Sequence, residues 1–131
     1  MQDIRWQQRF RNYENAFLFF EQIIQKESLT EIEKAGLVHA YEFTFELAWK
    51  TMKDYLEAKD IPVKFPREVI KESFRYDLIA DGETWMDMLD KRNLMTHTYD
   101  ETSAKTAIML IQNNYYSLLR DLYNILKNDI R

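Results

Sequence analysis

The chain contains no cysteine, and its 131 residues include two glycines and two prolines. The absence of cysteine excludes disulfide bonds and thiolate metal sites, and the two histidines, His39 and His97, are too far apart in the sequence to suggest a zinc site. We therefore expect neither a metal nor another cofactor. The shortage of glycine and proline removes most of the turn signals that a many-stranded protein needs, so the sequence predicts an all-α fold.

Long apolar runs and an excess of positive charge are also missing. No apolar run approaches the ~18 residues that span a bilayer, and the segment from Met1 to Trp6 lacks the apolar stretch of a signal peptide. We expect a soluble, cytoplasmic protein without membrane contact. The formal net charge of -4 argues against a protein that coats nucleic acid through its overall field, so any contact with RNA must be local.

The whole chain is 46% hydrophobic and 15% aromatic. Helical periodicity is strong in its first half. A first helix is predicted from about Asp3 to Lys26, and a second opens at a capping box of Ser28 and Glu31 and ends near Lys59. Their apolar stripes are Trp6, Phe10, Tyr13, Phe17, Phe20 and Ile24 in the first helix, and Val38, Tyr41, Phe45, Ala48, Met52 and Tyr55 in the second.

The second half predicts shorter elements. Pro66 begins a third helix that runs through Phe74 and Leu78, and Asp81-Gly82 closes it. A fourth helix carries Trp85, Met88, Leu89 and Arg92, and a fifth carries Ile108, Ile111, Tyr115, Leu118, Leu122 and Ile125. Residues 1–131 are therefore expected to form one domain, an antiparallel four-helix up-and-down bundle with an additional short helix.

Several large apolar residues lie off these stripes. Phe43 and Leu47 fall nearly opposite the core face of the second helix, and Leu18 and Phe19 are similarly displaced on the first. They could pack under the third helix or the Pro62–Pro66 connector. We favour a homodimer built on the first two helices, because large aromatics on the wrong face of two helices suggest an interaction patch.

The segment Arg92-Asn93-Leu94-Met95-Thr96-His97-Thr98-Tyr99 is the part of the chain that suggests chemistry. Arg92 offers a charged fork for phosphate oxygens, and His97 can exchange a proton near neutral pH. Arg92 falls on the apolar face of its helix, which indicates either an anion-binding cleft or a head group paired with a buried acid.

His97 would point away from Arg92 in an unbroken helix, so a break is expected between them. Thr98 and Glu101 form a possible capping box for the last helix, which would place His97 just ahead of a helix N-terminus that favours phosphate and a neutral imidazole. Asn93 would orient His97 or the phosphate. The structural alternative is that His97 fills a helix junction. For His39, which lies inside the second helix, we expect a structural role only.

Basic residues near the motif are candidates for RNA contact, although most such charges simply lie on solvated helix faces. Lys91 and Lys105 flank the motif, together with Arg92, and a second group occupies one earlier segment: Lys64, Arg67, Lys71 and Arg75.

The pattern Arg92, Asn93 and His97 resembles the signature of the HEPN superfamily, and its extension to Tyr99 resembles the HepT-like branch. The segments 43–50 and 85–89 resemble helices that flank the motif in nucleotidyltransferase substrate-binding proteins. The resemblance implies a dimeric, metal-independent ribonuclease with Arg92, Asn93 and His97 as catalytic residues. It also implies a cognate minimal nucleotidyltransferase as partner and Tyr99 as the acceptor of AMP groups that silence the nuclease.

Two functions therefore remain open. The first is a HepT-like endoribonuclease toxin controlled by a nucleotidyltransferase antitoxin, in which His97 moves a proton at the ribose 2′-hydroxyl or the leaving 5′-oxygen and Arg92 stabilises the phosphorane. The alternative is a non-enzymatic substrate-binding subunit of a two-component nucleotidyltransferase, which the acidic net charge favours.

Overall fold

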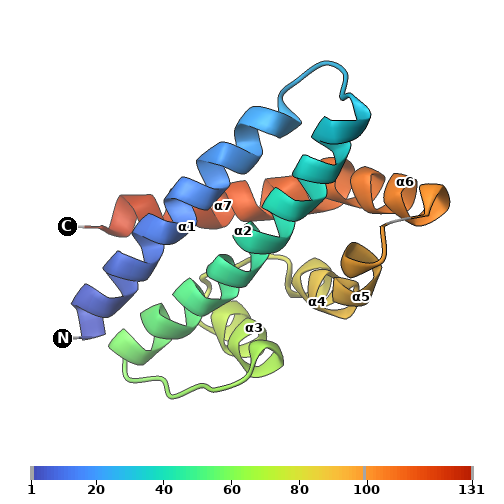
Figure 1. Cartoon of the computed structure of the whole chain (residues 1–131). Helices are drawn as coiled ribbons and strands as arrows, with labels where there is room; N and C mark the ends of the chain where they lie inside the picture. The colour runs from blue at the N-terminus through green and yellow to red at the C-terminus, as the bar shows by residue number, and fades with distance from the viewer. Residues whose placement is uncertain (1, 99, 131) are drawn as a thin grey trace.

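The computed structural model describes residues 2–98 and 100–130, and the regular structure in that part of the chain is helical (Figure 1). Helices α1 (Gln2–Ile24) and α2 (Glu31–Ala58) pack side by side in opposite directions. The remaining elements are α3 (Pro66–Arg75), α4 (Gly82–Asp90), α5 (Arg92–Thr96), α6 (Glu101–Leu110), the π-helical turn η1 (Ile111–Tyr115) and α7 (Tyr116–Asp129). The predicted all-α bundle is confirmed, and the described residues contain more than the one additional short helix that was expected. Within the described residues, no helix is long and apolar enough to cross a membrane.

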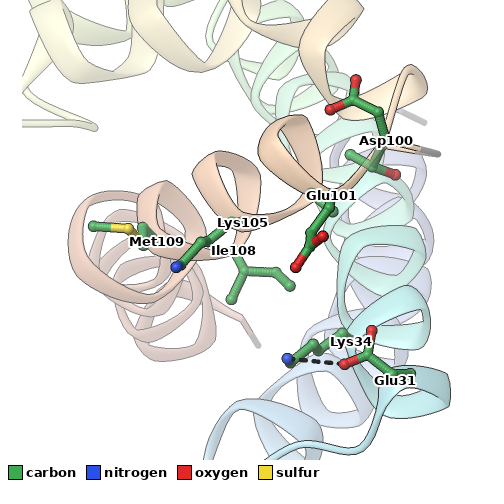
Figure 2. A pocket seen from close by; sticks show the side chains of 9 residues that line it. Glu31, Lys34, Asp100, Glu101, Lys105, Ile108 and Met109 are labelled. Carbon is green, nitrogen blue, oxygen red and sulfur yellow. Dashed lines mark hydrogen bonds and ion pairs between the residues drawn. The ribbon is translucent and has the colours of Figure 1, made fainter.

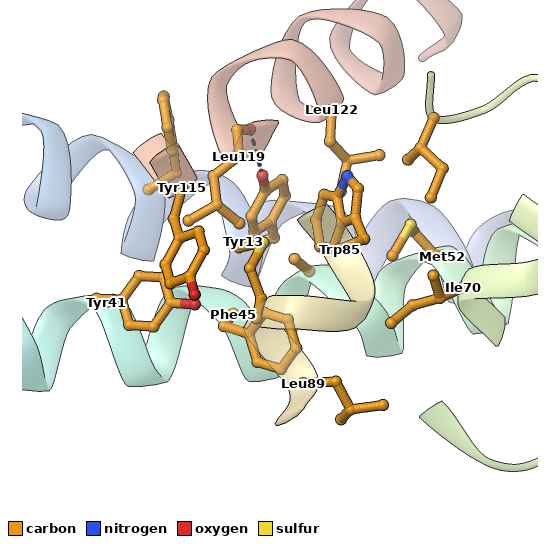
Figure 3. Close-up of a cluster of buried hydrophobic side chains, with 14 of the residues drawn as sticks. Tyr13, Tyr41, Phe45, Met52, Ile70, Trp85, Leu89, Tyr115, Leu119 and Leu122 are labelled. Atoms are coloured by element: carbon orange, nitrogen blue, oxygen red, sulfur yellow. Dashed lines mark hydrogen bonds between the residues drawn. The ribbon is translucent and has the colours of Figure 1, made fainter. Parts of the chain in front are cut away.

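Aromatic side chains dominate the core. The predicted stripe of α1 is buried from Trp6 to Phe20, and Phe17 stacks on Tyr123 of α7 with ring centroids 5.0 Å apart. The Tyr13 hydroxyl donates to the carbonyl oxygen of Leu119, which ties α1 to α7 (Figure 3). Burial of each such ring stabilises the fold by about 1.5–3 kcal/mol. The stripe predicted for α2 is likewise buried.

The start of α2 lies two residues later than predicted. Thr30, not Ser28, is the N-cap: its hydroxyl accepts from the Glu33 backbone N–H at 3.1 Å, and the Glu33 carboxylate accepts from the Thr30 N–H at 3.0 Å. Leu29 packs partly buried against the core immediately before this cap. That contact places Thr30, rather than Ser28, at the helix entrance.

The boundary between α3 and α4 also differs from the prediction. Helix α3 ends at Arg75, and Leu78 is buried in the following segment after Asp77 adopts a positive φ of 63°. Asp81 does not close α3 but caps α4, since its carboxylate accepts from the Thr84 N–H at 3.0 Å. An aspartate directly ahead of a helical stretch is a strong N-cap.

The last predicted helix is interrupted by η1. Its core face is Ala107 before the interruption, Ile111 and Tyr115 within it, and Leu119, Leu122 and Leu126 after it. Three predicted core positions are not fully buried: Ile108, before the turn, and Leu118, after it, are half-buried, and Ile125 is 44% exposed. A π-helical turn takes up an extra residue, so the buried face after it shifts along the sequence.

Helix α4 is anchored between α2 and the last helical segment. Trp85, Met88 and Leu89 are buried, and the Trp85 ring stacks on Phe45 of α2 with centroids 6.2 Å apart (Figure 3). This packing fixes α4 against α2. It therefore sets the position of the motif that follows.

The large apolar residues that lie off the stripes differ in how exposed they are. Phe19 and Phe43 are 59% and 55% exposed, and Leu18 is 41% exposed, so packing under α3 or the connector does not bury them. Leu47, in contrast, is half-buried against the core, and its predicted place on the outer face is wrong. His39 lies edge-on to Phe43 with ring centroids 4.6 Å apart, in agreement with a structural role.

Candidate functional site

The motif occupies a turn between two helices. Helix α4 ends at Asp90, Lys91 has φ -89° and ψ 9°, and Arg92 opens the short helix α5. The prediction that Arg92 lies on the apolar face of α4 is wrong, because the turn at Lys91 ends α4 first. The Arg92 side chain is instead 49% exposed. The turn has moved the guanidinium from the core to the surface.

Arg92 has a weak carboxylate partner. Its Nη1 lies 3.5 Å from Glu46 Oε1, and the Glu46 side chain is 41% exposed. The other Glu46 oxygen accepts from Trp49 Nε1. An ion pair at this distance and exposure is worth about 0–1 kcal/mol. The guanidinium is therefore held toward α2 but remains able to bind an anion.

A small pocket lies beside this pair, between α2 and α5. It has a volume of about 110 Å³ and is lined by Tyr41, Phe45, Glu46, Arg92 and Met95, among others. The Tyr41 hydroxyl is buried and finds no hydrogen-bond partner within the described residues. Burial raises its pKa, so the hydroxyl stays protonated. The pocket has room for roughly three water molecules.

His97 lies at the other end of α5. It is the residue directly after the helix, its backbone N–H donates to Leu94 at 3.2 Å, and its side chain is exposed. Helix α5 thus separates Arg92 from His97 by about one and a half turns. Arg92 contacts the α2 pocket, whereas His97 lies where the chain turns toward α6. The predicted break does not fall between them, because α5 is continuous from Arg92 to Thr96 and ends at His97 itself.

The start of α6 does not bind phosphate in the predicted way. Asp100, not Thr98, is its N-cap, and the Asp100 carboxylate accepts from the backbone N–H of Ser103 at 2.9 Å and from its hydroxyl at 2.8 Å. These bonds lower the Asp100 pKa. An anionic side chain already occupies the positive end of the helix. The predicted Thr98–Glu101 capping box is therefore wrong.

Asn93 lies at the opposite end of α5 from His97. It lines a cleft of about 410 Å³ together with Arg92, Asp90 and residues of the α3 start. Its backbone carbonyl accepts from the Thr96 hydroxyl at 2.9 Å. Asn93 thus shares a cleft with Arg92, which favours a role in orienting phosphate.

Lys91, at the turn between α4 and α5, forms an ion pair with a residue of α4. Its Nζ lies 2.7 Å from Asp87 Oδ1, and Asp87 Oδ2 accepts from the Tyr115 hydroxyl of η1. The bonds from Lys91 and Tyr115 lower the Asp87 pKa. Asp87 therefore connects the last helical segment to the residue that precedes Arg92.

Lys105 lines a different cleft, between α2 and α6, with a volume of about 510 Å³ (Figure 2). Three carboxylates and two ammonium groups line it: Glu31, Asp100 and Glu101, with Lys34 and Lys105. Lys34 forms an ion pair with Glu31 at 3.1 Å. The balance of charge makes this cleft a poor place for an RNA phosphate, although Thr98 of the motif reaches its edge.

Tyr99 lies outside the described residues. Among the residues that are described, no group of three or more histidine, cysteine, aspartate or glutamate side chains could hold a metal ion.

Sequence reasoning missed Glu46 and Asp87, which hold Arg92 and Lys91. The spacing of Asp87 and Lys91, four residues apart on a helix, was a usable signal for that pair. The pairing of Glu46 with Arg92 has no local signal, because it joins two helices that are distant in the sequence.

Comparison with known proteins gives three findings. A family model described as nucleotidyltransferase substrate binding protein like matches residues 8–128. A Haemophilus influenzae protein named as a probable ribonuclease HepT is 35% identical over 75 residues, which cover 53% of this chain and 51% of that protein. The aligned part thus spans about half the length of this relative.

Two solved structures share the fold. A protein from Thermus thermophilus has a TM-score of 0.78 and 27% identity, over 91% of this chain and 99% of that protein. A Haemophilus influenzae protein, described as revealing the fold of a substrate binding domain of a nucleotidyltransferase, has a TM-score of 0.78 and 25% identity, over 90% and 98%. The resemblance inferred from the motif is confirmed.

Proposed function

The chain belongs to the family of nucleotidyltransferase substrate-binding proteins, and from that premise we propose that it is a HepT-like endoribonuclease that needs no metal ion. In this proposal it is toxic when free and is controlled by a cognate minimal nucleotidyltransferase. The observation that carries the proposal is the surface position of Arg92, whose partner Glu46 is exposed and 3.5 Å away. A phosphate can displace such a partner.

The proposed reaction uses three residues of the motif. His97 removes the proton from a ribose 2′-hydroxyl, the 2′-oxygen attacks the adjacent phosphorus, and the bond to the 5′-oxygen breaks. Arg92 stabilises the charge that builds on the phosphorane, and Asn93, from the same cleft, orients the phosphate. The leaving 5′-oxygen takes a proton from a second histidine, which a homodimer would supply as the other copy of His97.

Cleavage of single-stranded RNA in the presence of EDTA tests this function. We expect His97→Ala to abolish cleavage while the helical content stays unchanged. Thr106→Ala is the control and should cut at the parent rate, since this exposed side chain of α6 donates to the Thr102 carbonyl and lies outside the motif. A requirement for a divalent ion, or wild-type cleavage by His97→Ala, would refute the proposed chemistry.

Regulation by the partner is proposed to act on Tyr99. Transfer of AMP to the Tyr99 hydroxyl would add a bulky anion beside the motif and repel an RNA phosphate. Intact-mass measurement after incubation with the cognate nucleotidyltransferase and ATP should show added AMP in the parent and in Tyr76→Phe, a control at an exposed tyrosine outside the motif. Adduct formation that persists in Tyr99→Phe would show that the acceptor is another residue.

A second candidate function is a non-enzymatic substrate-binding subunit of a two-component nucleotidyltransferase. It is favoured by the net charge of -4 and by the carboxylates in the cleft between α2 and α6, neither of which suits RNA. A folded protein that binds the nucleotidyltransferase but cuts no RNA would support this function over the nuclease.

A further inference from the structure

The cleft that Arg92 and Asn93 share continues onto a segment outside the motif. Its other wall is the end of the connector and the first turn of α3, which contribute Phe65 and Arg67. Asp90, the last residue of α4, lies between the two walls. The cleft has a volume of about 410 Å³. It is therefore far larger than the ~150 Å³ that is enough to hold a benzene ring.

Phe65 presents an aromatic ring to this cleft. Its side chain is 67% exposed, although Val63, two residues earlier in the same extended segment, is buried. In extended backbone, side chains two residues apart point to the same side, so Phe65 would be expected to be buried like Val63. Pro66, however, begins α3 directly after Phe65, and the chain changes direction there. The ring thus lies at the surface and is not covered by the core.

Arg67 reaches across the cleft. Its Nη2 donates to Asp90 Oδ1 at 2.8 Å, and Nη1 lies 3.7 Å from the sulfur of Met86. Both Arg67 and Asp90 are 56% exposed, so their ion pair contributes little net stability. The pair nevertheless positions the guanidinium. Arg92 lines the other wall of this cleft while its Nη1 pairs with Glu46 of α2, so the lining itself contains two arginines and one carboxylate.

An exposed aromatic ring next to two arginines is the combination that binds unpaired nucleotides. Bases stack on aromatic side chains, and guanidinium groups bind the phosphates that join them. The local positive charge is notable in a chain whose net charge is -4. The cleft between α2 and α6, by comparison, has more carboxylates than ammonium groups and is lined by no aromatic ring among the described residues.

We propose that the cleft binds one unpaired RNA nucleotide next to the phosphate held by Arg92, with its base stacked on Phe65 and its phosphate bound by Arg67. This inference rests on the proposed nuclease function and specifies its substrate as single-stranded RNA. Bases within a duplex are stacked on one another and cannot reach Phe65.

Binding can be measured separately from cleavage. Fluorescence anisotropy with a short labelled RNA, in EDTA and in a His97→Ala background, compares the single strand with the same strand annealed to its complement. We expect Phe65→Ala to weaken binding of the single strand by on the order of tenfold and to leave the weak duplex binding unchanged. Phe65→Trp should retain the affinity.

The salt dependence of binding separates the contribution of the Arg67 charge from that of the Phe65 ring. Arg67→Ala should reduce the salt dependence of single-strand binding by about one unit of slope, whereas Phe65→Ala should not change the slope. Phe74→Ala is the matched control, because Phe74 is 49% exposed on the same helix but lines a different pocket. It should bind as the parent does.

Several outcomes would overturn the inference. These are failure of the parent to bind the single strand, equal losses in Phe74→Ala and Phe65→Ala, or a Phe65→Ala defect confined to association with the nucleotidyltransferase. If the wild type cuts RNA while the Phe65 and Arg67 variants bind and cut normally, the nucleotide site is refuted and the proposed nuclease function is retained. Binding through Phe65 and Arg67 without any cleavage would retain the nucleotide site and refute the nuclease.

Discussion

Arg92 is available to a ligand because the backbone turns at the residue before it. Had α4 continued, the guanidinium would have entered the core, where an unpaired charge is very costly. At the surface its carboxylate partner, Glu46, is a competitor that any phosphate must displace. The strength of that competition can be measured with one substitution.

Glu46→Gln should tighten binding of single-stranded RNA by about two- to fivefold, because it removes a charge whose pairing with Arg92 is worth at most ~1 kcal/mol. The amide oxygen can still accept the bond from Trp49 Nε1. Glu57→Gln, on the same helix and paired with Lys53, makes the same change in net charge far from the motif and serves as the control. Equal tightening in both variants would show a general charge effect rather than competition for Arg92.

Among the elements, η1 has the clearest consequence for the motif. The π-helical turn ends at Tyr115, whose ring stacks on Tyr41 (Figure 3). The Tyr115 hydroxyl donates to Asp87. Asp87 also pairs with Lys91, so the last helical segment and the turn before Arg92 meet at one carboxylate. The Tyr115 pKa is raised by burial and by this bond, which keeps the hydroxyl a donor.

Asp87 should make the stability of the protein depend on acidic pH. Its pKa is lowered by its bonds to Lys91 and Tyr115, so its contribution is fully present above about pH 4, the unfolded-state pKa, and is lost as pH falls through the folded value. Because the carboxylate is 39% exposed, we expect about 1 kcal/mol or less. Urea unfolding at pH 7 and pH 3 should show a smaller loss for Asp87→Asn than for the parent. An identical loss in both would remove Asp87 as the cause.

At the scale of the whole molecule, the exposed aromatics of α1 and α2 bear on assembly. Phe19 and Phe43 lie more than half exposed on helices whose opposite faces form the core. A monomer also supplies one motif, while the proposed reaction needs two proton-transfer groups. Both observations favour a homodimer that uses the outer side of these helices.

Sedimentation at micromolar concentrations should show a dimer for the parent and a monomer for the double variant Phe19→Ser/Phe43→Ser, because two large apolar contacts become polar. Cleavage of RNA should fall with the dimer. Phe74→Ser, which alters an exposed phenylalanine on α3, should remain dimeric. A monomeric parent would remove both the interface and the composite site.

Local patterns were sufficient for most of the fold. The stripes of α1 and α2 and the end of α2 followed from helical periodicity, because burial of one face repeats with the helix itself. The motif was recognisable from the identity and spacing of Arg92, Asn93 and His97. The family resemblance followed from these residues together with Tyr99 and the flanking segments 43–50 and 85–89.

Boundaries and pairings depended on the tertiary structure. The observed N-caps are Thr30, Asp81 and Asp100, whereas the sequence had indicated Ser28 and Thr98 for two of these helices. Several polar residues near each helix start can cap it, and the packing of the neighbouring residues decides which of them does. The π-helical turn shifted the buried face of the last segment, and the turn at Lys91 moved Arg92 from the core to the surface. The contacts of Arg92 with Glu46 and of Arg67 with Asp90 join separate helices, so they arise only after packing has brought those helices together.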